Sequence, residues 1–271
     1  MTDTTTANAD LAGFQELEPP FTHAGMTHRV FWIGEGSPVL VMHELPGLTP
    51  AALRFGRRLA QRGFRVYLPL LFGAPAQDDT RGSYRALCVS REFANLQAGV
   101  SAPIVDWLRA LATHLSTRHQ QSKVGAIGMC LTGAFAIPLV LEPCVTAPVA
   151  AQPGAPFSVV FTATGIGRGP WMTELNVSDA DVEQAVIRLR RDNLTLLAGR
   201  FEKDRICPAE RLDRLQRQFG DRLIRRELPG GSILKPPHAT LTTVYEKAPD
   251  DPNEPTHKWF EEVVAFLRER L

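Results

Sequence analysis

The stretch "VGAIGMCLTG", residues 124–133, decides the fold, because it leads from an apolar run through a single cysteine into a turn of small residues. Its first six residues are typical of a strand buried on both faces of a parallel sheet. Cys130 follows at the turn, where the free N–H groups of a helix that starts there would favour a thiolate. The stretch therefore indicates either a nucleophile or an inert core cysteine, and the rest of the chain has to decide between them.

Working outward, strand patterns alternate with helix patterns along the chain. Strands are predicted at 28–34, 38–44, 65–70, 123–129, 145–153, 194–200 and 222–228. Helices are predicted at 49–64, within 93–117, at 130–142, 178–191, about 208–219 and about 257–270, with Thr49 and Ser178 as N-caps. This alternation predicts an α/β fold with a mostly parallel central sheet and helices on both faces.

Length and composition favour one domain, since 271 residues with 44% hydrophobic content can bury a single large core. Residues 1–20 are rich in Thr, Ala and Asp and close on two prolines, so we expect a flexible N-terminal extension. Residues 21–271 then form the domain. Within it, residues 155–177 have little periodicity and form either a lid or a long connection.

Charge and cysteine usage exclude several classes of function. Lys and Arg total 30 against 29 Asp and Glu, so no basic field draws the chain to nucleic acid or to anionic membranes. The spacing of Cys88, Cys130, Cys144 and Cys207 matches no common zinc signature. The chain shows neither a signal peptide nor an apolar run of about 18 residues, so we expect a cytoplasmic protein that acts on a small molecule.

Two further residues give Cys130 the companions that a nucleophile needs. The pattern Gly128-Met129-Cys130-Leu131-Thr132-Gly133 is close to the nucleophile elbow G-x-S-x-G, with Thr132 in place of the second glycine. Asp204, in "FEKDRICPAERL", and His238, in "PGGSILKPPHATL", each follow a predicted strand. Groups at the carboxyl ends of parallel strands converge at one edge, and the order nucleophile, acid, histidine is that of a hydrolase triad.

With these residues in place, the sequence resembles the dienelactone hydrolase family, a cysteine-nucleophile branch of the α/β-hydrolase fold. The resemblance covers the chain from about residue 25 onward. It rests on "VMHELPGL" at 41–48, "GMCLTG" at 128–133, "DRICP" at 204–208 and the loop that carries His238.

The resemblance implies a role for four side chains. Cys130 would be the nucleophile, His238 its general base and Asp204 the group that orients the imidazole. Glu44 matches the glutamate that contacts the cysteine in the resting state and helps substrate binding to activate the thiol. His43, its neighbour on the strand, should point into packing instead, because adjacent strand residues face opposite ways.

The reaction implied is cleavage of a small carboxylic ester or lactone through a cysteine acyl-enzyme, with no metal and no organic cofactor. The backbone N–H groups of Leu45 and Leu131 would form the oxyanion hole. We expect a monomer or a homodimer.

One position departs from the family pattern. Its best-known members bind the substrate carboxylate with two arginines, one of them four residues after the catalytic histidine, where this chain has Thr242. A threonine cannot make the bidentate contact of an arginine, so activity on dienelactone itself is in doubt. Candidates for the other arginine are Arg81, which we take as the substrate-binding candidate, Arg85 and Arg91. Candidates for apolar pocket lining are Phe161, Trp171 and Met172.

Two other classes of protein remain open. One is a non-catalytic α/β-hydrolase-fold protein that binds a small molecule, in which Thr132 and Thr242 would mark a decayed site. The other is a thiol redox protein in which Cys130 forms a sulfenic acid or a disulfide with Cys207.

Overall fold

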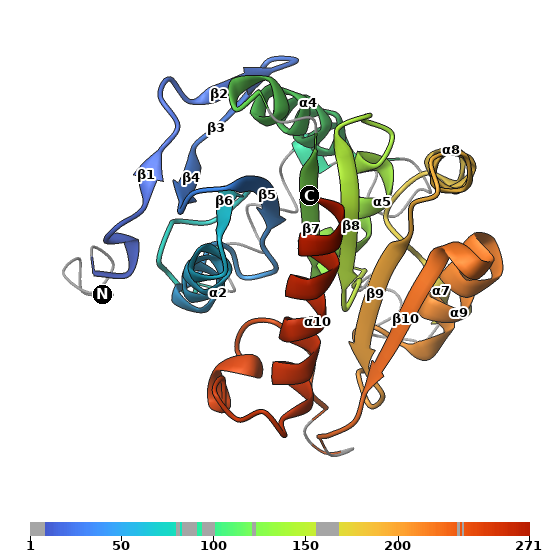
Figure 1. The fold of residues 1–271 in the computed structure, drawn as a ribbon. Coiled ribbons are helices and arrows are strands. Elements are labelled where there is room, and N and C mark those ends of the chain that lie inside the picture. The colour runs from blue at the N-terminus through green and yellow to red at the C-terminus, as the bar shows by residue number, and fades with distance from the viewer. Residues whose placement is uncertain are drawn as a thin grey trace.

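An eight-stranded sheet forms the centre of the protein (Figure 1). The computed structural model describes residues 9–79, 82, 91–93, 101–120, 123–155, 168–231, 234 and 236–271. The strand order is β1-β4-β6-β5-β7-β8-β9-β10. The strands are β1 (Gln15–Glu16), β4 (Val30–Ile33), β5 (Ser37–Met42), β6 (Phe64–Pro69), β7 (Val124–Met129), β8 (Val145–Ala151), β9 (Leu196–Phe201) and β10 (Leu223–Leu228), with β2 (Phe21–His23) and β3 (Met26–His28) in a separate hairpin.

The sheet is mostly parallel, as the alternating pattern predicts. From β6 to β10 every neighbouring pair is parallel, whereas β4 runs antiparallel to β6, and β1 antiparallel to β4, at one edge. The carboxyl ends of β5, β7, β8, β9 and β10 therefore lie along the same border of the sheet. This is the border where groups from distant parts of the chain can meet.

Helices cover both faces of the sheet (Figure 1). The helices are α2 (Pro50–Gln61), α4 (Pro103–Arg118), α5 (Ala136–Leu139), α7 (Arg168–Thr173), α8 (Asp179–Arg191), α9 (Ala209–Phe219) and α10 (Pro255–Arg270). Helices α2 and α10 bury their apolar sides against one face, and α4, α5, α8 and α9 pack on the other. The two faces thus hold two separate hydrophobic cores, which keep the strands rigid between them.

The two predicted N-caps, Thr49 and Ser178, are confirmed. The Thr49 hydroxyl accepts a hydrogen bond from the Ala52 N–H at 3.2 Å, and the Ser178 hydroxyl accepts one from the Asp181 N–H at 3.0 Å. The helix predicted over 130–142 is much shorter, since a 3₁₀ segment, η2 (Cys130–Phe135), comes first and α5 ends at Leu139. Pro138 lies in α5 and offers no N–H to a longer helix.

Part of the segment 1–20, predicted as a flexible extension, belongs to the sheet and the core. Gln15 and Glu16 pair with Phe31 and Trp32 of β4, and Leu17 is buried. A two-residue strand has no periodicity that a sequence could show, so this contact could not be predicted. Of the predicted lid or connection at 155–177, residues 156–167 lie outside the described residues, and α7 follows them.

Candidate active site

Cys130 lies at a sharp turn between β7 and η2. It is half-buried and has a φ of +52°, a left-handed conformation that a residue with a side chain seldom adopts. A Cβ atom on Gly128 would lie 2.1 Å from the Thr132 carbonyl oxygen, and one on Gly133 would lie 2.6 Å from the Pro153 Cα. Both positions therefore require glycine. Gly133 thus does what the second glycine of the G-x-S-x-G pattern is expected to do, one residue later in the chain.

Thr132 has a structural task in this turn. Its side chain is fully buried, and its hydroxyl accepts a hydrogen bond from the Met129 N–H at 3.1 Å. The same oxygen lies 2.9 Å from the Met42 carbonyl, to which it donates. Thr132 thus joins the turn to the end of β5, so its presence at the glycine position is no sign of a decayed site.

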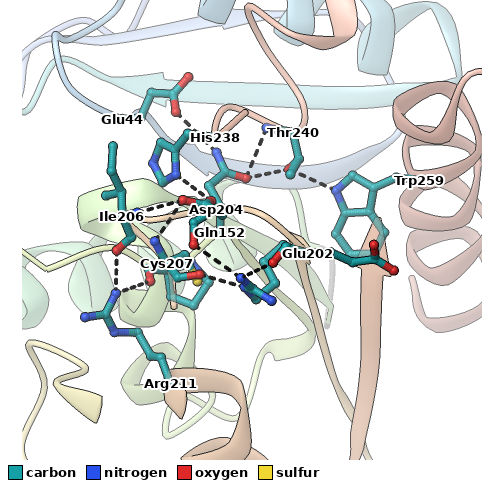
Figure 2. A network of polar contacts seen from close by, with 12 residues as sticks. Glu44, Gln152, Glu202, Asp204, Ile206, Cys207, Arg211, His238, Thr240 and Trp259 are labelled. Carbon is teal, nitrogen blue, oxygen red and sulfur yellow. Dashed lines mark hydrogen bonds and ion pairs between the residues drawn. The ribbon is translucent and has the colours of Figure 1, made fainter. Parts of the chain in front are cut away.

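Asp204 and His238 meet directly, although they lie in loops after different strands (Figure 2). His238 Nδ1 is 2.7 Å from Asp204 Oδ2. The other carboxylate oxygen, Oδ1, accepts hydrogen bonds from the Ile206 N–H at 2.8 Å and the Cys207 N–H at 2.9 Å. Because both oxygens are held, Asp204 fixes the plane and the tautomer of the imidazole.

The other ring nitrogen of His238 is directed at Cys130. Nε2 is buried and bonds no oxygen or nitrogen atom in the described part of the chain. The ligand atoms of Cys130, His238 and Glu44 all lie within 4.8 Å of one another. Burial by itself would lower the pKa of His238, but the neighbouring Cys130 and Asp204 together raise this pKa well above its ordinary value. A protonated imidazole beside the sulfur favours the thiolate.

Glu44 completes the group from the end of β5. Its carboxylate is buried, with Oε1 accepting a hydrogen bond from the Thr242 hydroxyl and Oε2 accepting one from Gln152 Nε2 at 3.2 Å. Burial raises the pKa of Glu44, while the charge of His238 and these two hydrogen bonds oppose the rise. Thr242 therefore binds a protein carboxylate at the position where the family pattern has an arginine.

His43 points away from the site, as predicted. It is fully buried, and its Nε2 accepts a hydrogen bond from the Leu71 N–H at 3.0 Å. Burial lowers the pKa of His43 to about 4, so the ring is neutral and serves packing.

Gln152 is a polar residue of the site that sequence reasoning missed. It follows β8, is fully buried and has a φ of +36°. Its Oε1 accepts hydrogen bonds from the Thr240 hydroxyl at 2.5 Å and the Thr240 N–H at 3.3 Å, and that hydroxyl accepts one from Trp259 Nε1 at 3.2 Å (Figure 2). Gln152 thus links Glu44 to the loop that carries His238. The sequence did offer one signal for Gln152, since it is the first polar side chain after an apolar strand.

Arg200, on β9, is a second missed residue. Its buried guanidinium donates to the carbonyl oxygens of Cys207 at 2.6 Å, Glu202 at 3.0 Å and Asp204 at 3.2 Å, and pairs with Glu227 at 2.5 Å. These contacts hold the loop that carries Asp204. A charged residue inside an otherwise apolar strand was the signal.

The structure describes some of the remaining predicted site residues and leaves others outside the described ranges. Leu45 directly follows Glu44 and Leu131 directly follows Cys130, so both backbone N–H groups belong to the two turns that meet at the thiol. Trp171 and Met172 are half-buried in α7, and Trp171 Nε1 donates to the Ala155 carbonyl at 3.2 Å. Arg81, Arg85 and Phe161, like the side chain of Arg91, lie outside the described residues.

A cavity of about 620 Å³ opens beside Glu44 and His238. Loops after β5 and β10 and the segment before α10 form its walls, with Leu45, Lys247 and Glu254 among the lining residues. Its volume suits a small organic substrate. Glu44, Cys130 and His238 are also close enough to share a metal ion, but a nucleophile beside its base gives the same arrangement and we assign no metal. That no cofactor is needed stays a prediction.

Comparison with known proteins agrees with this architecture. A protein from Klebsiella pneumoniae assigned as a dienelactone hydrolase has a TM-score of 0.59 at 15% identity, with 94% of this chain and 99% of the other covered. An esterase from Pyrococcus furiosus has a TM-score of 0.58 at 16% identity, over 100% and 98%. A dienelactone hydrolase from Anabaena variabilis has a TM-score of 0.55 at 14% identity, over 96% and 99%. No curated protein matches the chain.

The layered sheet and these structural neighbours define an α/β-hydrolase fold. The pattern of the dienelactone hydrolase family matches residues 31–228, and the chain therefore belongs to that family. As a member it is a hydrolase of ester bonds that acts on a small molecule. Among the described residues, no helix is both long and apolar enough to cross a bilayer.

Proposed function

We propose that the protein hydrolyses a carboxylic ester or lactone through an acyl-enzyme on Cys130. The observation that carries this proposal is the continuous chain from Asp204 through His238 to Cys130 at the carboxyl ends of three strands. The oriented imidazole beside a sulfur at a strained turn is the arrangement that a thiolate nucleophile requires.

Each step uses a group already in place. The Cys130 thiolate attacks the carbonyl carbon, and the oxyanion that forms accepts hydrogen bonds from the Leu45 and Leu131 N–H groups. The C–O bond breaks as protonated His238 gives its proton to the leaving oxygen. Neutral His238 then takes a proton from water, which attacks the thioester and releases the acid and the thiolate. With a lactone the alcohol and the acid stay in one molecule.

The proposed substrate has no carboxylate to be bound at position 242, where the family pattern has an arginine. Thr242 is fully buried and its hydroxyl is used by Glu44, so it offers no cation and no free donor to a substrate. A neutral ester or a simple lactone fits this surrounding better than dienelactone, whose carboxylate would need an arginine from elsewhere.

The redox alternative has less physical support. Burial raises the pKa of Cys207 to about 12, so this thiol stays protonated at neutral pH. Thiol exchange needs a thiolate, and a protonated Cys207 is a poor partner for an oxidised Cys130.

The first experiment compares p-nitrophenyl acetate and lactone hydrolysis by the wild type and by Cys130→Ala. The substitution should lower kcat by about 10³-fold or more, because the whole covalent route is lost. Cys144→Ala is the matched control, since Cys144 is a buried free cysteine at the opposite end of β8 and should keep full activity. Circular dichroism checks the fold of both variants.

Trapping the intermediate gives an independent result. In His238→Asn the deacylating base is absent, so an acetyl group from p-nitrophenyl acetate should stay on the protein, and peptide mass spectrometry should find it on Cys130. Equal turnover by wild type and folded Cys130→Ala would rule out the proposal.

A further inference from the structure

Arg211, in the first turn of α9, is a buried cation that the triad does not explain. Its side chain is fully buried. Nη1 donates to the carbonyl oxygens of Ile206 at 2.8 Å (Figure 2) and Pro153 at 3.0 Å. Nη2 donates to the Trp171 carbonyl oxygen at 2.6 Å. Every oxygen that it bonds in the described part of the chain is thus a peptide carbonyl, and the Glu174 carboxylate acts on it without a hydrogen bond.

A buried guanidinium without a hydrogen-bonded anion is unfavourable. Removing an ion from water carries a large desolvation penalty, and carbonyl dipoles offset this penalty only in part. Burial accordingly lowers the pKa of Arg211, opposed by Cys207, Cys130 and Glu174. Such a charge suits a site where a negative charge forms.

The Cys130 sulfur lies in a niche made by the two segments that Arg211 holds. A Cβ atom on Gly154 would be 3.2 Å from Cys130 Sγ and 3.4 Å from Ile206 Cγ2, so sulfur, Gly154 and Ile206 are packed together. Gly154 follows Pro153, and the carbonyl oxygens of Pro153 and Ile206 are both bound by Arg211 Nη1. The guanidinium therefore lies directly behind the niche.

The peptide between Pro153 and Gly154 connects the charge to the nucleophile. Arg211 binds its carbonyl oxygen, and its N–H donates to the Cys130 carbonyl at 2.7 Å. A cation on the oxygen of a peptide polarises it and strengthens its N–H as a donor. The positive end of this dipole thus points at the backbone carbonyl of Cys130.

We propose that Arg211 is a positioning residue that stabilises the thiolate of Cys130, through its charge and through the peptide that it polarises. This inference rests on the proposed function of Cys130. Among the described residues, the other ionisable groups placed near the thiol are His238 with Asp204 behind it, Glu44 at the end of β5, and Cys207. Arg211 thus adds a cation to the one that His238 supplies.

Alkylation tests this role without any substrate. The rate at which iodoacetamide modifies Cys130, followed by peptide mass spectrometry across pH, reports the thiolate directly. In Arg211→Gln the titration should move to higher pH by about one unit, so that alkylation falls about tenfold at pH values well below the wild-type midpoint. Arg211→Lys keeps the charge and should titrate close to wild type. Arg217→Gln, at an exposed position on the same helix, is the matched control and should change nothing.

Each variant has its own contrary outcome. A folded Arg211→Gln protein with the wild-type titration would overturn the proposal and leave Arg211 a structural link only. If Arg211→Gln does not fold, Arg211→Lys still decides, because a full upward shift with the charge retained would also overturn it. Failure of the proposed function is separate, since a normal titration shift without any ester hydrolysis would discard the hydrolase mechanism and keep the electrostatic role.

Discussion

At the scale of single residues, the site depends on polar groups that are almost all engaged. Asp204 uses one carboxylate oxygen for two backbone N–H groups and the other for His238, and Glu44 uses its two oxygens for Thr242 and Gln152. His238 Nε2 is the buried nitrogen left over, and it faces the thiol. A single substitution among these residues should therefore affect activity by moving a proton rather than by disturbing the packing.

Asp204→Asn tests this directly. The Asn oxygen can still accept from the Ile206 and Cys207 N–H groups, so the loop should keep its shape. The amide NH₂ would face His238 Nδ1 and place the imidazole proton on Nε2, so that this nitrogen could no longer accept a proton from the thiol or from the attacking water. We expect kcat/KM for ester hydrolysis to fall by about 10²–10⁴-fold with little loss of stability.

The matched control for this change is Asp221→Asn, because the Asp221 side chain is 77% exposed and forms a long surface ion pair with Arg222. It should have wild-type kinetics. Wild-type kcat/KM in a folded Asp204→Asn protein would mean that Asp204 does not orient the base.

At the scale of elements, the connections that follow β5, β7, β8, β9 and β10 each contribute a side chain to the site. Glu44 follows β5, Cys130 follows β7, Gln152 follows β8 and Asp204 follows β9, while His238 comes from the loop after β10. The turn from β7 into η2 is tightly constrained, because its two glycines leave no room for a Cβ atom.

Gly128→Ala should therefore disrupt the turn. The new Cβ would lie 2.1 Å from the Thr132 carbonyl oxygen, a backbone atom that cannot move without shifting Cys130. We expect a loss of about 1–3 kcal/mol or more in the free energy of unfolding, measured with urea, together with loss of esterase activity. Gly169→Ala in α7 is the control, since a Cβ there meets nothing within 4 Å. Equal stability of the Gly128 variant and wild type would show that the turn is not this tight.

At the scale of the whole molecule, the buried charges couple stability to pH. Burial by itself would lower the pKa of His238, but Cys130 and Asp204 raise it well above 6.5. The native state then holds this proton more tightly than the unfolded state does. The stabilisation is complete below about pH 6.5 and is lost as the pH rises through the raised pKa.

We expect the free energy of unfolding to decline as the pH increases above 7, and this part of the decline to be absent in His238→Gln. Urea titrations at several pH values would measure both. His114→Gln is the control, because burial lowers the pKa of His114 and its removal should leave the alkaline decline in place. An unchanged decline in His238→Gln would show that His238 is not protonated in the native state.

The amino-acid sequence by itself determined the layered α/β architecture, the turn at Cys130 and the order of Cys130, Asp204 and His238 along the chain. These follow from periodicity and strand-end position, which are local properties that adjacent residues reveal. The structure brings these residues together with Glu44, as the family resemblance implied.

Only the tertiary structure decided which side chains support them. Gln152 lies 108 residues from Glu44, and Thr242 lies 198 residues from it. Arg211 holds Pro153 and Trp171, and the strand β1 joins β4 without any pattern of its own. Hydrogen bonds between such distant groups depend on the angle and register at which elements pack, and periodicity shows which face of an element is buried but not what it meets there.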